Sequence, residues 1–140
     1  APALWRYTTS KPAADWSQPG FGDTSWLEGK SGFGTSGTPG AVIGTVWNTP
    51  DIWLRREIVV PAKKLKDLAL WMHHDEDAQV YVNGVLTAKG DGWTTEYDTM
   101  PLMDAGKAAF KPGKNLIAIH CRQTGGGQYV DLGLVTMPKN

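Results

Sequence analysis

The sequence predicts an all-β fold, an antiparallel β-sandwich of the jelly-roll type. Several stretches alternate apolar and polar residues with the period of two that a half-buried strand requires. Seventeen glycines among 140 residues can supply the many turns that join short strands. No stretch shows the regular succession of strand, helix and strand that a parallel sheet needs. We therefore expect about eight strands in two packed sheets, with one minor helix.

Length and charge limit the class of protein. A chain of 140 residues is most economically one domain covering residues 1–140. Its 14 basic and 14 acidic residues balance, so we expect no nucleic-acid partner. No apolar run approaches the roughly 20 residues of a bilayer-spanning helix, so we expect no membrane partner either. The single cysteine, Cys121, excludes an internal disulfide and, between apolar neighbours, predicts a buried thiol.

The first predicted strand is Leu4–Thr8, which is rich in aromatic and β-branched residues. Residues 11–50 then contain many glycines and prolines but no long periodic pattern. A loop of this length is uncommon unless it packs by its own side chains or serves a function. We expect its aromatic residues to hold it against the sheet, with at most a short helical turn at residues 24–26.

The clearest long strand is Asp51–Val60. Arg56 interrupts a row of aliphatic side chains on its more apolar face, which is unusual for a strand packed on a core. A buried arginine needs a carboxylate partner. We expect the acidic residues 75–77 to supply it.

A hairpin is predicted in the middle of the chain. A strand over residues 65–74 is followed by the alternating segment 78–82. Asn83-Gly84 then predicts a type I′ turn, because both residues tolerate positive φ. Residues 85–88 return as the partner strand.

The C-terminal third predicts three strands and the minor helix. We expect a short strand at residues 94–97 and a helix at residues 104–110 that Asp104 caps. Residues 115–121 are nearly all apolar, as expected for a strand at the centre of a sheet. The last strand, residues 128–135, has inward positions at Val130, Leu132 and Leu134 and outward positions at Tyr129 and Asp131.

Four stretches of the sequence match a known family in order. They are Asp23–Trp26, Asp51–Arg56, Asp75–Gly84 and Pro112–His120. Together they resemble the galactose-binding-domain-like β-sandwich modules attached to bacterial glycoside hydrolases, such as the sugar-binding domains of family 2 β-galactosidases. The similarity spans the chain from Trp5 to Leu134.

The resemblance implies a non-catalytic accessory role in a larger bacterial enzyme that degrades polysaccharide. This chain would be excised from that enzyme, whose attached catalytic domain would be its partner. The resemblance also implies a secreted, periplasmic or cell-surface location. The binding residues of the better-known families lie on variable loops, so none is carried over by position.

The first candidate site is the run His73-His74-Asp75-Glu76-Asp77 between two predicted strands. Its imidazoles and carboxylates could exchange hydrogen bonds with the hydroxyls of a sugar. One alternative is a structural ion-pair network with Arg55 or Arg56 in a solvated turn. Another is a structural calcium site, with oxygen ligands from Asp75, Glu76 and Asp77, although the spacing matches no EF-hand loop.

The second candidate site surrounds the three glycines at positions 125–127. Arg122, Gln123, Gln128 and Tyr129 flank them. The arginine and the glutamines could bind hydroxyls, Tyr129 could stack on a sugar, and the glycines let a ligand approach the backbone. The alternative is a tight strand connection whose polar groups satisfy one another.

Two of the seven tryptophans are expected to be exposed stacking platforms. Trp93 lies at the tip of a glycine-rich turn, and Trp47 precedes the turn residues 48–50. We expect most of the others to pack in the core or under loops, namely Trp5, Trp16, Trp26, Trp53 and Trp71.

The leading hypothesis is a carbohydrate-binding module that holds a hydrolase near a polysaccharide or oligosaccharide. The alternative is a structural module that supports a catalytic domain and has no ligand of its own. An exposed aromatic ring beside convergent polar groups would favour the first, and a broad exposed apolar patch the second. A small glycosidase that uses residues 75–77 as acid and base is disfavoured, because the chain is too short for a deep cleft.

Overall fold

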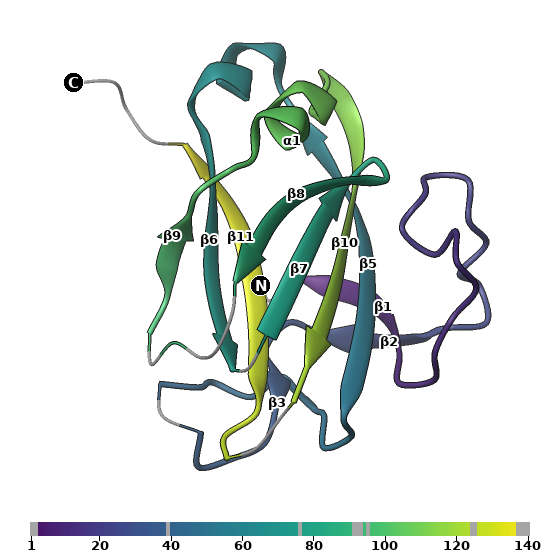
Figure 1. Ribbon diagram of the computed structural model, residues 1–140, viewed down its shortest axis with the longest axis vertical. Coiled ribbons are helices and arrows are strands. Elements are labelled where there is room, and N and C mark those ends of the chain that lie inside the picture. Colours follow the sequence, from purple (N-terminus) through teal and green to yellow (C-terminus); the bar gives the residue numbers. More distant parts are fainter. Residues whose placement is uncertain are drawn as a thin grey trace.

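The structure is a computed structural model that describes residues 3–38, 40–75, 77–90, 94, 96–123 and 126–136. Two sheets pack face to face as a sandwich (Figure 1), which confirms the predicted all-β class. Every strand pair is antiparallel except β3 with β4, which is parallel.

Sheet A has six strands. In spatial order they are β2 (Leu27–Lys30), β1 (Leu4–Thr8), β5 (Asp51–Val60), β10 (Gly113–Arg122), β7 (Asp77–Val82) and β8 (Val85–Gly90). The apolar strand β10 lies inside this sheet, between β5 and β7, as its sequence predicts.

Sheet B has five strands. In spatial order they are β4 (Thr45–Val46), β3 (Phe33–Gly34), β11 (Tyr129–Thr136), β6 (Leu68–Asp75) and β9 (Asp98–Met100). A 3₁₀ helix, η1 (Ala62–Asp67), joins β5 to β6, and a short helix, α1 (Asp104–Ala109), precedes β10. Neither helix has the length and apolar character needed to cross a bilayer, among the residues that the structure describes.

The core fills the space between the sheets. It takes alternate residues from the long strands, as period-two patterning requires. Among its fully buried members are Ile52, Leu54, Leu70, Met72, Val80, Val82, Ile117, Ile119 and Val130. Cys121 is also fully buried in this core, which confirms the expected buried thiol.

The predicted hairpin is confirmed. Asn83 and Gly84 adopt φ values of 51° and 86°, which suit a type I′ turn between β7 and β8. The Asn83 side chain also donates to the carbonyl of Ala109 at 2.8 Å, and its oxygen accepts from the Leu116 N–H at 2.9 Å. This one turn residue therefore joins the hairpin to α1 and to β10.

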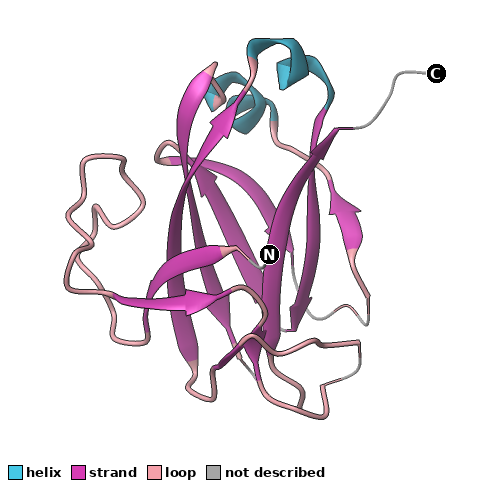
Figure 2. Cartoon of the chain, turned by 180° about the vertical axis from the view of Figure 1, so that it is seen from behind, coloured by secondary structure: helices cyan, strands magenta, loops and turns pink. Residues whose placement is uncertain are grey.

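The long segment before β5 differs in part from the expectation. Residues 9–26 form the expected loop, which projects from the side of the sandwich (Figures 1 and 2). The glycine-rich part that follows forms the three short strands β2, β3 and β4. Short strands with glycine at their pairing positions carry little periodic signal, so the sequence predicted too few strands.

Smaller differences occur at element ends. The 3₁₀ helix takes the start of the strand expected at residue 65, and β9 begins at Asp98, after the segment expected as a strand. The Asp104 side chain does not cap α1, because Met103 is the N-cap residue. Gly106 is tolerated in this helix because it packs against Thr87, where a Cβ would collide.

Candidate functional site

Polar and aromatic side chains gather on the outer face of sheet A, the face turned away from the core. Cross-strand register sets His120 of β10 beside Trp53 of β5 on one side and Gln79 of β7 on the other. Gln79 in turn pairs with Lys89 of β8. Residues that pair across strands point to the same face. These four side chains therefore form a row across the sheet.

A second row of side chains lies one step along the strands. In it, Arg122 of β10 pairs with Asp51 on one side and with Asp77 on the other. The two rows are tied together, because His120 Nε2 lies 2.7 Å from the Asp51 carboxylate. The Arg122 guanidinium lies 3.6 Å from the same carboxylate and remains two-thirds exposed. Its remaining N–H groups can therefore donate to a ligand.

The imidazole of His120 is held in a fixed orientation. Its ring lies parallel to the indole of Trp53, with the centroids 4.7 Å apart and the planes 6° apart. Trp53 itself is buried. Contact on one ring face and a carboxylate 2.7 Å from Nε2 leave the imidazole little freedom, which is the preorganisation that a binding site needs.

The loop of residues 9–26 forms a wall along this face, and Arg55 holds it there. The guanidinium of Arg55 is 3% exposed and donates to the Asp23 carboxylate at 2.9 Å. It also donates to the carbonyls of Trp16, Gln18 and Phe21. One buried cation thus satisfies several backbone acceptors of a loop with no regular structure.

This arrangement corrects the expectation for Arg56. Arg55 is the buried arginine, and its carboxylate partner is Asp23 rather than one of residues 75–77. Arg56 is half-buried, with its guanidinium 6.0 Å from the ring centroid of Trp5. The pattern misled because the loop covers the outer face of β5, so burial there does not follow alternation.

Trp16 of this loop lies next to the side chains that form the two rows on the outer face of sheet A. Its ring meets Tyr81 edge-on at 5.5 Å and His120 edge-on at 6.4 Å between centroids. The aromatic packing expected for this loop is therefore confirmed, and Trp26 is buried in it as well. The wall gives one side of the outer face an aromatic border.

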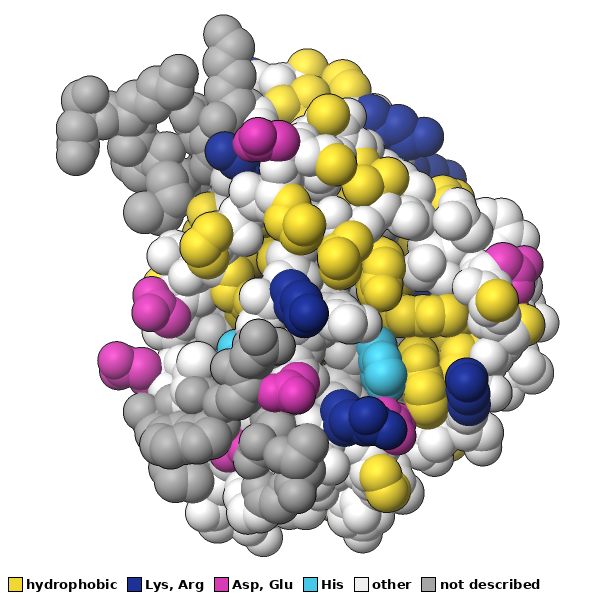
Figure 3. All heavy atoms as spheres, viewed as in Figure 1, with side chains coloured by type: hydrophobic (Ala, Val, Ile, Leu, Met, Phe, Trp, Pro, Cys, Tyr) yellow, Lys and Arg dark blue, Asp and Glu magenta, His cyan; other side chains and the backbone are white. Residues whose placement is uncertain are grey.

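The result is a groove of about 280 Å³, here called the sheet A groove. It is lined by Asp77, Ala78, Gln79, Lys89, His120 and Arg122. Figure 3 shows this face, where a histidine side chain lies among basic, acidic and hydrophobic ones. The cationic side chains are balanced by carboxylates, so the groove suits a neutral ligand with many hydroxyls. Its size is at the small end of ligand pockets.

The first candidate site predicted from sequence is mostly buried. His73, His74 and Asp75 are 0%, 4% and 6% exposed. The chain at Thr94 covers this end of β6: His73 Nε2 lies 3.0 Å from the Thr94 carbonyl oxygen, and the His74 N–H donates to the Thr94 hydroxyl. The structure does not bring these buried side chains to a groove, and their contact with a sugar stays a prediction. They serve packing at the end of β6.

Calcium at this turn stays a prediction, because Glu76 lies outside the described residues. Within the described part of the chain, no three His, Cys, Asp or Glu side chains are grouped to hold a metal. The Asp75 carboxylate packs closely on Gly127, where a Cβ would lie 2.7 Å from Oδ2.

The second candidate site is divided by the structure. Arg122 lines the sheet A groove, as described above. Gln123 donates to the Gly126 carbonyl, and the buried Gln128 donates to the Thr49 carbonyl. Tyr129 is fully buried, with its hydroxyl bonded to the Val42 carbonyl. These last three bonds belong to a strand connection, so of the four residues only Arg122 is brought to a groove.

The tryptophans also differ from the expectation. Trp47 is 2% exposed and donates its indole N–H to the Thr49 hydroxyl, so it presents no platform. Trp93 lies outside the described residues. Trp5, Trp26 and Trp53 are buried as expected, whereas Trp71 is 40% exposed.

Sequence reasoning missed His120, Gln79 and Lys89 as groove residues. The period of two along β10 and β7 could have placed His120 and Gln79 opposite core residues, so a usable signal was present. Their meeting depends on the order β5-β10-β7-β8, which no local pattern contains.

Ionisable groups of unusual pKa cluster on the outer face of sheet B. The Tyr97 hydroxyl donates to the Asp131 carboxylate and lies 3.0 Å from the Tyr129 hydroxyl. Burial raises the pKa of Asp131 and of both tyrosines, and burial lowers the pKa of His73, whose ring is 4.7 Å from that of Tyr129. These groups bind one another, so they form a structural network rather than an open site.

Comparison with known proteins gives a result at the level of structure. No family model matches the sequence, and no curated protein matches it significantly. A glycosyl hydrolase family 2 member from Bacteroides cellulosilyticus is similar, with a TM-score of 0.64 and 16% identity over 95% of this chain and 20% of that one.

Two other glycosidases show the same relation. A β-glycosidase from Bacteroides vulgatus has a TM-score of 0.60 and 16% identity over 97% of this chain and 20% of its own. A β-glucuronidase from Bacteroides uniformis has a TM-score of 0.63 and 15% identity over 93% of this chain and 16% of its own. This chain thus spans about a fifth of the length of the enzymes it resembles. It shares the fold of a small β-sandwich region in family 2 glycoside hydrolases, which confirms the expected resemblance at the level of fold.

Proposed function

We propose that the chain is a non-catalytic carbohydrate-binding module that directs an attached glycoside hydrolase to polysaccharide. The observation that carries the proposal is the sheet A groove, where His120, stacked on Trp53 and paired with Asp51, lies beside Arg122 and Gln79. Donors and acceptors with an aromatic border are what hydroxyl recognition requires.

The similarity in fold to part of several glycosidases supports the proposed partner, a catalytic domain in the same polypeptide. Binding in a shallow groove would be weak and reversible, which suits an enzyme that must move along its substrate. A secreted, periplasmic or cell-surface location in a bacterium follows from the proposal, because polysaccharide substrates lie outside the cell.

Affinity electrophoresis tests the proposal. The 140-residue chain is run through gels that each contain one soluble polysaccharide, and calorimetry follows on any polymer that retards it. We expect retardation by at least one polymer and a loss of about tenfold in affinity for Arg122→Ala, because a hydrogen bond from a charged group is lost.

Arg6→Ala is the matched control. Arg6 is also an exposed arginine near a carboxylate, 3.8 Å from Glu28, but it lies on β1 outside the groove. Its substitution should leave affinity unchanged. Equal losses for both arginines would mean that charge alone drives retention, and the groove would not be the site.

A structural support module is the second candidate, and one observation favours it. β1 pairs with β5 only at residues 53–55, and β3 pairs with β11 only at residues 129–130. Beside the remaining halves of β5 and β11 lies a mostly apolar groove of about 570 Å³, where Val59 is 70% exposed. A catalytic domain packed there would bury this surface. Retention of the chain by a separately produced catalytic domain, lost in Val59→Asp, together with no retardation by any polysaccharide, would select this function.

A further inference from the structure

The outer face of sheet B carries the most exposed aromatic ring in the described part of the chain. Trp71 of β6 is 40% exposed, whereas the other described aromatic side chains are buried or half-buried. Its neighbours in sequence, Leu70 and Met72, are fully buried, so the Trp71 side chain points away from the core. Exposing an indole costs hydrophobic free energy, and contact with a ligand would recover part of it.

The surface beside Trp71 is open on one side. Its cross-strand partner on β11 is Gly133, and a Cβ built at Gly133 would meet no heavy atom within 4 Å. On the other side its partner is Thr99 of β9. The indole therefore stands between a flat glycine floor and a hydroxyl group. A planar ring with a clear approach and a polar neighbour is an arrangement that can hold the apolar face of a sugar ring.

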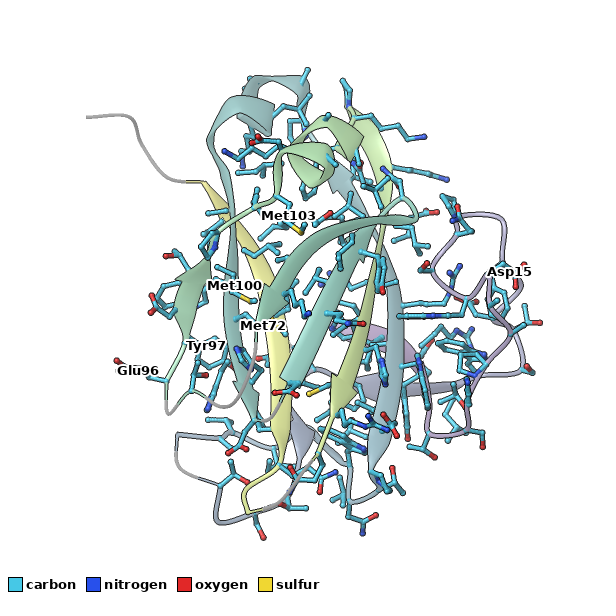
Figure 4. The ribbon with its side chains drawn as sticks, viewed as in Figure 1. Asp15, Met72, Glu96, Tyr97, Met100 and Met103 are labelled. Atoms are coloured by element: carbon cyan, nitrogen blue, oxygen red, sulfur yellow. The ribbon has the colours of Figure 1, made fainter. Side chains whose placement is uncertain are left out.

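The Tyr97 network fixes this ring in place. The rings of Trp71 and Tyr97 are nearly parallel, 14° apart, with centroids 6.3 Å apart, so they are offset and leave much of the indole uncovered. The hydroxyl of Tyr97 is bonded to Asp131 and lies beside Tyr129. Figure 4 shows Tyr97 directed toward the sandwich and Glu96 directed away from it. A ligand would meet a platform that is already ordered.

A cavity continues the platform along the edge of the sheet. It has a volume of about 290 Å³ and is lined by Leu68, Ala69, Thr99, Met100, Pro101, Leu102 and Lys107. Ala69 lies on the same face of β6 as Trp71, two residues away, and Thr99 borders both the indole and the cavity. A ligand of two or more linked rings would be long enough to use both.

We propose that Trp71, Gly133 and this cavity form a second carbohydrate site, which takes neutral sugar residues of a polysaccharide. It lies on the opposite face of the sandwich from the sheet A groove. The inference rests on the proposed function for the class of ligand, but it uses different residues. One sugar ring stacks on Trp71 over Gly133, and the next residue enters the cavity beside Thr99 and Lys107.

Two sites on opposite faces would let one chain hold two polysaccharide strands, or one strand that wraps around the sandwich edge. Either arrangement raises retention by a polymer beyond that by a short oligosaccharide. We therefore expect two ligand molecules to bind each chain, in addition to the higher affinity for a polymer.

The test is calorimetry with the hexasaccharide of whichever neutral polymer, among galactomannan, xyloglucan and mixed-linkage β-glucan, retards the chain. The wild-type chain should bind two molecules, and Trp71→Ala and His120→Ala should each bind one. Trp71→Phe should keep both sites, because an aromatic face remains. Gly133→Leu should also remove one site, since it fills the open floor and leaves Trp71 in place. In affinity gels, Trp71→Ala should weaken retention about tenfold.

The possible outcomes separate the two proposals. Unchanged stoichiometry and retention in both Trp71→Ala and Gly133→Leu, with a loss in His120→Ala, would overturn this inference and leave the proposed groove standing. A loss in Trp71→Ala with no effect of His120→Ala or Arg122→Ala would establish the platform and move the site away from the groove. No retention of the wild-type chain by any of the polymers would overturn both. Because Trp71 is exposed, urea denaturation should confirm that each variant is folded.

Discussion

The outer faces of the two sheets differ in what borders their exposed side chains and what holds those side chains in place. On sheet A, a loop packs over part of the strands, and beside it lies a groove with mostly polar side chains, of which His120 and Arg122 lie close to the Asp51 carboxylate. On sheet B, the described residues form no comparable wall over Trp71, and the polar groups of Tyr97, Asp131 and Tyr129 bond to one another. The comparison teaches that a loop packed over a sheet can give its outer face an aromatic border, whereas the face around Trp71 is ordered by ring stacking and hydrogen bonds among its own side chains.

The largest expected effect comes from removing the cation that holds the sheet A wall. Arg55→Met should lower the free energy of unfolding by about 3 kcal/mol, because the carbonyls of three loop residues and the Asp23 carboxylate lose their donor. Binding in the groove should be lost with it, while binding at Trp71 should persist. Urea denaturation and the calorimetric stoichiometry measure the two effects.

Arg56→Met is the control for this comparison. Arg56 is the next residue, but its guanidinium only lies over Trp5, and such a contact is worth roughly 0.5–1 kcal/mol. A loss as large as that of Arg55→Met would show that the loop does not depend on Arg55 in particular.

The two glycines that border sheet edges should respond in opposite ways. A Cβ at Gly90 would lie 2.6 Å from Nε2 of the buried His74 ring, so Gly90→Ala should cost about 1–3 kcal/mol through overpacking. Gly133→Ala meets open space and should change stability by less than about 0.5 kcal/mol. Thermal unfolding of both variants checks this. Equal effects would contradict the open floor beside Trp71.

The calcium hypothesis predicts an effect of intermediate size on the free energy of unfolding. The ion would bind near the sheet A groove rather than near Trp71. If Asp75, Glu76 and Asp77 bind calcium with the affinity of an extracellular module, millimolar calcium should raise the free energy of unfolding by about 1–2 kcal/mol. A chelator should reverse the gain. If the melting temperature were the same with calcium and with chelator, calcium binding at this turn would be contradicted.

The smallest expected effect is the pH dependence of stability that His73 and Asp131 of sheet B contribute. Burial lowers the pKa of His73 below its usual value near 6.5, so the unfolded chain takes up a proton first as pH falls, and the His73 contribution to stability is lost on the acid side. Burial raises the pKa of Asp131, so its contribution is greatest at acid pH and is lost as pH rises through the folded pKa. His73 and Asp131 therefore change the free energy of unfolding with pH in opposite directions.

Single variants separate the two slopes. Between pH 7 and pH 5, Asp131→Asn should make the loss of stability on acidification steeper, and His73→Gln should make it shallower or reverse it. Urea midpoints across this range measure the slopes, and Asp15→Asn, an exposed carboxyl in the loop of residues 9–26, is the matched control. If both substitutions changed the wild-type slope in the same direction, the directions given for these two groups would be contradicted.

Local patterns accounted for most of the fold. The period of two in Asp51–Val60, the positive-φ pair Asn83-Gly84 and the apolar run before His120 are local, and each produced the element that was predicted. Short strands such as β3 and β4 were missed because two residues cannot carry a period. The calcium site and Trp93 stay predictions.

The binding surfaces depended on the tertiary structure. The sequence by itself determined which side chains could face away from the core, including His120, Gln79 and Trp71, because alternation along a strand is set by the backbone. Only the tertiary structure decided which of those faces a loop covers and which strands lie side by side. That is why Arg55 rather than Arg56 is buried, and why Trp47 and Tyr129 are hidden while Trp71 is exposed. Burial depends on neighbours that are distant in sequence, and alternation within one strand contains no information about them.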